Sequence, residues 1–300
     1  MGVKGLYSYI GKYKVSIDPR NFSPKRIGVD AMSLLYKHKG NFENILILLQ
    51  SLQQVGHRIF FVFDGKPPVE KEREVQARKD QKSVAAGKLA SLEAFLESST
   101  AETLEPAARA FLEQSLERLQ RQSWHMTRDL RQKFQGELWK AGIPYVKSIS
   151  EADDVLVDLY NGGKLDVILT TDMDYLLSGV QHLWVPTHRG LFQYEEISLD
   201  RILEGESLSV AGLADAGLLC GTEERLKAKG IPCATAFNLI RHYGSLEGVL
   251  NGTTNDKVIR EMFPDRASVE SARATLAPKN SYERIRPDHL ERVKDFLTTL

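Results

Sequence analysis

The chain has 300 residues, of which 42% are hydrophobic, and its 40 lysines and arginines balance 40 aspartates and glutamates. This length allows one large α/β domain or two small ones with a sizeable core, and zero net charge weakens but does not exclude a nucleic-acid partner. Cys220 and Cys233 are the only cysteines, which excludes a disulfide framework and a zinc-site spacing. There is no signal-peptide pattern, and the most apolar stretch, Ile45–Leu52, is too short to span a bilayer. We therefore predict an intracellular protein.

Two apolar segments in the first quarter of the chain end in aspartate. Lys25–Asp30 (KRIGVD) predicts a short strand, and a helix is expected from Met32 to about Gly40. Phe42–Val55 has the apolar spacing of a second helix, and His57–Asp64 (HRIFFVFD) predicts another strand. Strands that alternate with helices in this way indicate a parallel sheet, whose strand ends would deliver these aspartates to one edge.

Residues 66–134 differ in character, because Lys, Arg, Glu, Gln, Ala and Leu dominate and no strand pattern is present. The segment predicts a helical insertion between two strands, and a solvated helical hairpin accounts for most of its length. Lys71 and Arg78 are seven residues apart, so two helical turns place them on the same face. There they contact a phosphate group, or they are two ordinary surface cations.

A second strand unit is expected at Gly142–Val146 (GIPYV). Ser150 follows with an acid three residues later, which resembles a capping box and would by itself explain Asp153. With Ser150 as the N-cap, Glu151 and Asp153 would lie in the first turn of a helix, beside the edge that already carries aspartates.

The segment Leu165–Leu177 (LDVILTTDMDYLL) is an apolar run that stops at Asp172 and Asp174. Val167–Leu169 predicts a strand buried on both faces, and in parallel sheets the chemistry lies just beyond the carboxyl ends of such strands. Two neighbouring carboxylates repel each other unless a cation lies between them. The alternative is a solvated loop with acids that cap a helix.

The last part of the chain contains a predicted strand at Leu183–Pro186, after which helical patterns run to the end. Gly217–Gly221 leads to Glu223, and a lysine and glycine at 229 and 230 precede a helix expected at Ala234–Tyr243. A helix, glycine hairpin and helix can hold a phosphate backbone through main-chain amides, or it is a plain connection between helices.

The acids expected at one sheet edge point to a metal. Six or seven hard oxygen ligands with no His or Cys among them suit Mg²⁺ or Mn²⁺ and not zinc. Two such ions about 4 Å apart would stabilise the attacking and leaving oxygens of a phosphodiester displacement. The predicted fold class is α/β, a mostly parallel central sheet flanked by helices.

Several motifs, in the same order, resemble the flap endonuclease/XPG family of structure-specific 5′ nucleases. They are MGVKGL at the start, VDAMSLLY at 29–36, FVFDGKPP at 61–68, HMTRDLRQKFQGELWKAGIPYV at 125–146 with SEADD and TTDMDYL after it, and LLCGTEERLKAKGI at 218–231. The resemblance spans about 250 residues. It implies a PIN-like 5′-nuclease domain over 1–250, with an arch at about 66–134, a helix–two-turn–helix at about 217–250, and a helical extension over 251–300.

The resemblance also assigns roles to residues. It implies a metal cluster made of Asp30, Asp64, Glu151, Asp153, Asp172, Asp174 and Glu223. Lys71 and Arg78 match a basic pair that polarises the scissile phosphate, and Tyr36 matches a tyrosine that stacks on the nucleotide next to the cut. The implied DNA contacts are Gly2, Lys66, Arg128, Lys229, Gly230 and Ile231.

The activity that the resemblance implies is hydrolysis of DNA phosphodiesters near single-strand/double-strand junctions, as a flap endonuclease or 5′ exonuclease in replication, repair or recombination. Two Mg²⁺ ions, replaceable by Mn²⁺, would take part in the hydrolysis. The 5′ single strand would thread through the arch, so that the enzyme recognises the shape of the DNA and not its base sequence. The nucleus or another site of DNA replication or repair is the expected location. The alternatives are a catalytically weak or inactive nucleic-acid-binding scaffold of the same fold and an RNA nuclease.

The chain departs from the family pattern mainly in the hairpin. Glu223 replaces the usual aspartate, and Pro232, which has no amide donor, replaces a glycine. Ala234 and Thr235 stand where two basic residues are usual, and Lys227 stands where a serine helps to hold K⁺. These changes argue against K⁺ binding in the hairpin and for a weaker grip on duplex DNA. The sequence has no sliding-clamp motif, and we expect a monomer that recognises DNA with a 5′ single-stranded end.

Overall fold

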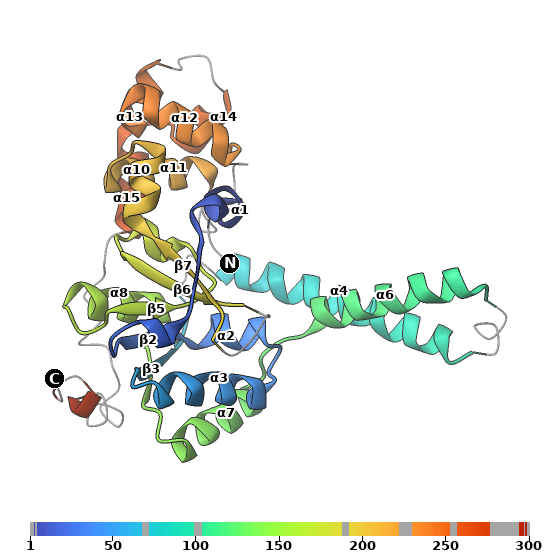
Figure 1. The fold of residues 1–300 in the computed structure, drawn as a ribbon. Helices are drawn as coiled ribbons and strands as arrows, with labels where there is room; N and C mark the ends of the chain where they lie inside the picture. Colours follow the sequence, from blue (N-terminus) through green and yellow to red (C-terminus); the bar gives the residue numbers. More distant parts are fainter. Residues whose placement is uncertain are drawn as a thin grey trace.

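A mixed sheet of seven strands forms the centre of the molecule in the computed structural model (Figure 1). The structure describes residues 3, 5–67, 72–98, 104–187, 192–221, 230–252, 257–276, 294–296 and 298. The strands are β1 (Val15–Ile17), β2 (Arg26–Asp30), β3 (Arg58–Phe63), β4 (Tyr145–Lys147), β5 (Val167–Leu169), β6 (His182–Pro186) and β7 (Tyr194–Ser198). Their order across the sheet is β1-β7-β6-β5-β2-β3-β4.

Five neighbouring strands of this sheet run in parallel. β2 pairs in parallel with β3 and with β5, and β4 and β6 extend the parallel part on either side. Only β7 runs antiparallel to its neighbours, β6 and β1. The mostly parallel sheet that the sequence predicts is therefore confirmed.

The described helices surround this sheet and form an additional group at one end of it (Figure 1). In the first 177 residues they are α1 (Leu6–Ile10), α2 (Ala31–Lys37), α3 (Phe42–Gln54), α4 (Glu72–Leu96), α6 (Pro106–Ser123), α7 (Arg128–Lys140), α8 (Ala152–Asn161) and α9 (Asp174–Leu177), with short 3₁₀ helices η1 (Gly11–Tyr13) and η2 (Pro19–Asn21). The later helices are α10 (Leu199–Glu206), α11 (Val210–Cys220), α12 (Cys233–Tyr243), α13 (Leu246–Gly252), α14 (Lys257–Met262) and α15 (Arg266–Leu276). Within the described ranges, none combines the length and the apolar character needed to cross a bilayer.

Side chains of the central strands alternate between two hydrophobic cores. Phe61 and Phe63 of β3 pack with α3 and α7, whereas Phe60 and Val62 point to the opposite face and pack with α8. β5 is buried along its whole length, with Ile168 in one core and its two neighbours in the other. The predicted burial of Val167–Leu169 on both faces is confirmed.

The helical insertion has two parts with different surroundings. Helices α4 and α6 pack against each other and extend away from the sheet as an antiparallel pair (Figure 1). Helix α7 instead lies against the sheet, where Phe134 and Leu138 are fully buried. We call the α4–α6 pair the arch. The boundaries expected for the domains remain predictions.

Two strands were not predicted. β7 lies at Tyr194–Ser198, so the expectation of helical patterns from there to the end of the chain is wrong. Its sequence, YEEIS, places two glutamates in the middle of the strand, and the alternation that marks a half-buried strand is lost. Tyr194 and Ile197 are nevertheless fully buried, because pairing with β6 decides the conformation of this segment. β1 is only three residues long and largely exposed, which leaves no apolar pattern to detect.

An ion cluster around the buried side chain of Asp215 connects the late helices. The Arg273 guanidinium of α15 donates to both oxygens of Asp215 in α11, at 2.8 and 2.7 Å, and to both oxygens of Glu247 in α13, at 2.5 and 2.7 Å. Asp215, only 1% exposed, also accepts from the amide of Leu246 at 2.8 Å. Hydrogen bonds from Arg273 hold the pKa of Glu247 low, at about 2.

Arg273→Met is expected to lower the free energy of unfolding by about 2–3 kcal/mol, because buried Asp215 would lose two hydrogen bonds from its partner, while the 37% exposure of Arg273 weakens the effect. Urea unfolding followed by circular dichroism measures this change. Arg266→Met on the same helix is the matched control, since Arg266 is 81% exposed and pairs only with exposed Glu270, so less than about 1 kcal/mol is expected. Equal losses in the two variants would contradict a structural role for the ion cluster.

Candidate active site

Aspartates lie at the carboxyl ends of three adjacent parallel strands. Asp30 is the last residue of β2, Asp64 follows β3, and Asp172 lies three residues beyond β5. The chain leaves β2 toward β3 on one side and returns as β5 on the other, so these strand ends flank a topological switch point, where α/β proteins bind ligands.

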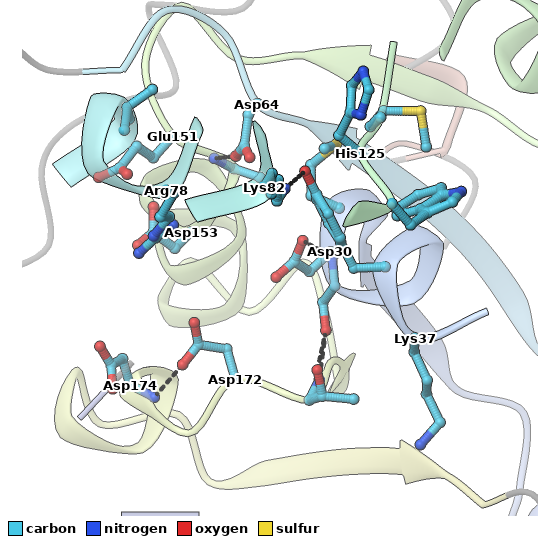
Figure 2. A pocket seen from close by; sticks show the side chains of 18 of the residues that line it. Asp30, Lys37, Asp64, Arg78, Lys82, His125, Glu151, Asp153, Asp172 and Asp174 are labelled. Atoms are coloured by element: carbon cyan, nitrogen blue, oxygen red, sulfur yellow. Dashed lines mark hydrogen bonds between the residues drawn. The ribbon is translucent and has the colours of Figure 1, made fainter. Parts of the chain in front are cut away.

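A cavity of about 1030 Å³ opens at this edge of the sheet. Six carboxylates line it, and Figure 2 shows them around one space: Asp30, Asp64, Glu151, Asp153, Asp172 and Asp174. Basic side chains line the same cavity: Lys37, Arg78, Lys79, Lys82, Arg121 and His125. The cavity therefore brings opposite charges together in a chain whose total charge is zero.

Asp30 accepts hydrogen bonds from two parts of the chain. Its Oδ1 accepts from the amide of Ser33 at 3.0 Å as the N-cap of α2, and its Oδ2 accepts from the hydroxyl of Thr170 at 3.2 Å. Burial, together with the negative charges of Asp64 and Asp172, raises the pKa of Asp30 to about 7. The ionised form is thus costly at this position unless positive charge is supplied.

Asp64 is joined to the start of α8, which carries two further acids. Its Oδ1 accepts from the amide of Ala152 at 2.8 Å, while the amide of Gly65 donates to the carbonyl of Ser150 at 2.6 Å. A Cβ at Gly65 would lie 2.1 Å from the carbonyl oxygen of Ser148, so only glycine permits this approach. The loop after β3 is thereby fixed beside Glu151.

The expectation that Ser150 caps α8 is wrong. The helix begins at Ala152, its N-cap is Glu151, and no side chain of the N-cap residue forms the capping hydrogen bond. The carboxylate of Asp64 accepts from the first helical amide instead, from a distant part of the sequence. Asp153 still lies in the first turn, and both Glu151 and Asp153 line the cavity.

The loop after β5 is organised by hydrogen bonds to its own acids. The amide of Asp172 donates to the hydroxyl of Thr170 at 3.0 Å, and the amide of Asp174 donates to Oδ1 of Asp172 at 3.1 Å. Asp174 in turn accepts from the amide of Val3 at 2.8 Å, which ties the N-terminal segment to the acidic cluster. Both acids therefore accept main-chain hydrogen bonds and also line the cavity, whereas the N-cap of α9 is Met173, which forms no side-chain capping hydrogen bond.

The chemistry of this donor set fits hard divalent cations. All six acids offer oxygen ligands, and burial together with repulsion from Asp64 and Asp172 raises the pKa of Asp30, a cost that a bound cation would relieve. Among the residues that the structure describes, however, no three acidic, His or Cys side chains are already gathered closely enough to hold one ion. Binding would thus draw carboxylates inward from the cavity wall.

Arg78 and Tyr36 line the same cavity as the acids, and Figure 2 shows Arg78 beside Asp153 and Glu151. Arg78 lies on α4 at the base of the arch, and Tyr36 lies near the end of α2. Lys82 also lines the cavity and was not predicted as a site residue, although it lies four residues after Arg78 on the same helix face, a spacing that could have indicated it. Trp124 and His125 were not predicted either, because they line the cavity only where the chain returns from the arch to the sheet.

Other predicted site residues lie elsewhere or outside the described ranges. Lys66 and Arg128 are exposed and do not line the cavity. Gly230 and Ile231 lie just before α12, where the amide of Ile231 donates to the carbonyl of Leu219 at 3.0 Å and Pro232 is the N-cap. Outside the described residues are Gly2, Lys71, Lys227, Glu223 and Lys229.

Comparison with known proteins gives two family-model matches. Residues 1–85 match the XPG N-terminal domain and residues 142–223 match the XPG I-region, so the two matches cover more than half of the chain. The chain belongs to the flap endonuclease/XPG family. Members of this family are structure-specific 5′ nucleases that hydrolyse phosphodiesters with the help of metal ions, and the resemblance inferred from the motifs is confirmed.

Three proteins illustrate the likeness within the family. Flap endonuclease 1-B of Physcomitrium patens is 31% identical over 224 residues, which are 73% of this chain and 59% of that protein. The catalytic core of Rad2 in complex with DNA substrate has a TM-score of 0.60 at 20% identity, over 99% of this chain and 94% of that one. GEN1 in complex with product DNA and Mg²⁺ has a TM-score of 0.53 at 15% identity, over 98% and 68%. The predicted fold class is thus confirmed, while the chain spans 59% of the length of the moss relative.

Proposed function

We propose that this chain is a structure-specific 5′ nuclease that hydrolyses DNA near single-strand/double-strand junctions with two Mg²⁺ ions, replaceable by Mn²⁺. The observation that carries the proposal is the single cavity in which six carboxylates face Arg78 and other cations. Rad2 in complex with DNA substrate and GEN1 with product DNA and Mg²⁺ share the fold, which supports DNA as substrate and Mg²⁺ as cofactor.

The proposed ligands are the six cavity acids, together with Glu223 from outside the described residues. Bound divalent cations stabilise negative charge on the oxygens of a phosphodiester under attack. The amide of Ala152 and the hydroxyl of Thr170 fix the orientation of Asp64 and Asp30, whose side chains line the cavity. Arg78 would donate hydrogen bonds to the scissile phosphate from the arch side.

The arch supports selection by shape. Its base lies over the cavity, because residues from α4 and from the end of α6 line the same space as the strand-end acids. A single strand with a free 5′ end would pass between the arch and the sheet, whereas a duplex is too wide to follow. Recognition would therefore depend on the junction and not on base sequence.

The test is cleavage of a labelled 5′-flap DNA with Mg²⁺, with EDTA, and with its 5′ end blocked by a bulky group. We expect cutting at the junction with Mg²⁺ only, and strong suppression by the block. Tight binding without any cutting would overturn the nuclease in favour of a scaffold. Cutting that the block leaves unchanged would contradict passage of the strand under the arch.

A further inference from the structure

Trp124 lies where the chain returns from the arch to the sheet, directly after α6. Its ring meets the ring of Tyr36 edge to face, with centroids 5.0 Å apart and planes at 88°. It also lies close to the turn after α2, since a Cβ at Gly40 would be 3.0 Å from Cζ2 of the indole. Trp124 thus contacts both this turn and the ring of Tyr36.

Lys82 reaches the same tyrosine from the other helix of the arch. Its ammonium donates to the hydroxyl of Tyr36 at 3.0 Å and lies 4.5 Å from the centre of the ring. Lys82 of α4 and Trp124 at the end of α6 therefore both contact one side chain of α2. Tyr36 is still 38% exposed, and all three residues line the cavity that contains the acids.

We propose that Trp124 is a positioning residue: it holds the ring of Tyr36, whose hydroxyl Lys82 fixes, in the orientation that receives one nucleobase of the strand entering beneath the arch. The inference rests on the proposed function and adds a residue to it. An exposed tyrosine without these contacts would sample several rotamers, and ordering it would oppose stacking. Trp124 and Lys82 remove that freedom before DNA arrives.

The arrangement also links the arch to the stacking position. Trp124 follows α6 and Lys82 belongs to α4, so a displacement of the arch would move both contacts of Tyr36 together. The ammonium of Lys82 lies near the exposed ring and can exchange its contact with the phenol for a backbone phosphate of the bound strand. One nucleotide would thus stack its base on Tyr36 while Lys82 contacts a phosphate of the same strand.

The test compares Trp124→Ala with the unsubstituted chain on two flap DNAs, one intact and one with an abasic nucleotide next to the scissile phosphate. On intact DNA we expect single-turnover cleavage to fall about tenfold, which is the order of one base–aromatic stacking contact. On abasic DNA the two proteins should differ by less than about twofold, because no base is left to stack. Equal losses on both DNAs would overturn the inference, since a general disturbance of the site acts without regard to the base.

Two variants and one binding measurement complete the design. Trp124→Phe keeps an aromatic edge and should retain most of the cleavage, whereas Trp139→Phe replaces a tryptophan of α7 that is 53% exposed and does not line the cavity, so no change is expected. Stacking is read separately with 2-aminopurine at the same nucleotide in EDTA, where its fluorescence should be quenched by the unsubstituted chain and less by Trp124→Ala. If no protein cuts DNA, the proposed nuclease fails, and equal quenching by both proteins would overturn the role of Trp124 on its own.

Discussion

Asp172→Asn is expected to lower Mg²⁺-dependent cleavage of a 5′-flap DNA by at least about a hundredfold, the order of loss seen when a group that stabilises transition-state charge is removed. The substitution keeps the shape of the side chain and an oxygen that can accept from the amide of Asp174, so the loop after β5 should keep its conformation. DNA affinity should be unchanged or slightly higher, because one negative charge leaves the cavity. Single-turnover kinetics and fluorescence anisotropy measure the two quantities.

The same variant should stabilise the protein when no metal is present. Asp172 contributes to the repulsion that raises the pKa of Asp30, and its removal is expected to increase the free energy of unfolding in EDTA by about 1 kcal/mol. Asp129→Asn is the matched control, because Asp129 is exposed on α7 and does not line the cavity. Full cleavage by Asp172→Asn would refute the assignment of this acid to the metal site.

Arg78→Met is expected to lower the single-turnover rate of flap cleavage by about a hundredfold while changing DNA affinity only a few-fold. Arg78 lines the cavity beside Asp153 and Glu151, where a guanidinium would hydrogen-bond the phosphate more strongly as negative charge builds up on the phosphate during the reaction. Methionine retains much of the aliphatic volume of the side chain and removes the donors. Rates at saturating protein, together with affinities in EDTA, separate the two effects.

Lys88→Met provides the comparison for Arg78, because Lys88 is exposed on the same helix and does not line the cavity. It should leave the rate within about twofold of the unsubstituted chain, as expected for a cation that contacts no reacting group. A loss of affinity with an unchanged rate in Arg78→Met would instead assign this residue to general attraction of the DNA backbone.

The parallel strands could be predicted because each is a short apolar run with a clear end. Burial on both faces leaves no polar interruption in Val167–Leu169, and the strand-end rule then gathers Asp30, Asp64 and Asp172 at one edge. The antiparallel strand Tyr194–Ser198 escaped prediction, since pairing with β6 and not its own pattern fixes its conformation. Long-range pairing has no local signal in a single sequence.

The acids of the candidate site could be predicted from the sequence, but the side-chain contacts that position them and Tyr36 could not. Ser150 had the local pattern of a helix cap, yet the carboxylate of Asp64, from a different strand, accepts the amide of Ala152. The contacts of Tyr36 with Trp124 and Lys82 depend on where two long helices of the arch return to the sheet. No spacing rule within one element contains that information.

The hydrogen bonds that brace the acids have an evolutionary consequence. Main-chain amides of Ser33 and Ala152 fix the carboxylates of Asp30 and Asp64 in the folded chain, so like charges are held near one another before any ligand arrives. The grouped acids thereby lower the free energy of unfolding at this edge of the sheet, as is common at functional sites. In a lineage released from selection for cleavage, amides in place of these acids would be neutral or favoured substitutions. Six acids around one cavity therefore carry an energetic cost that a bound cation would offset.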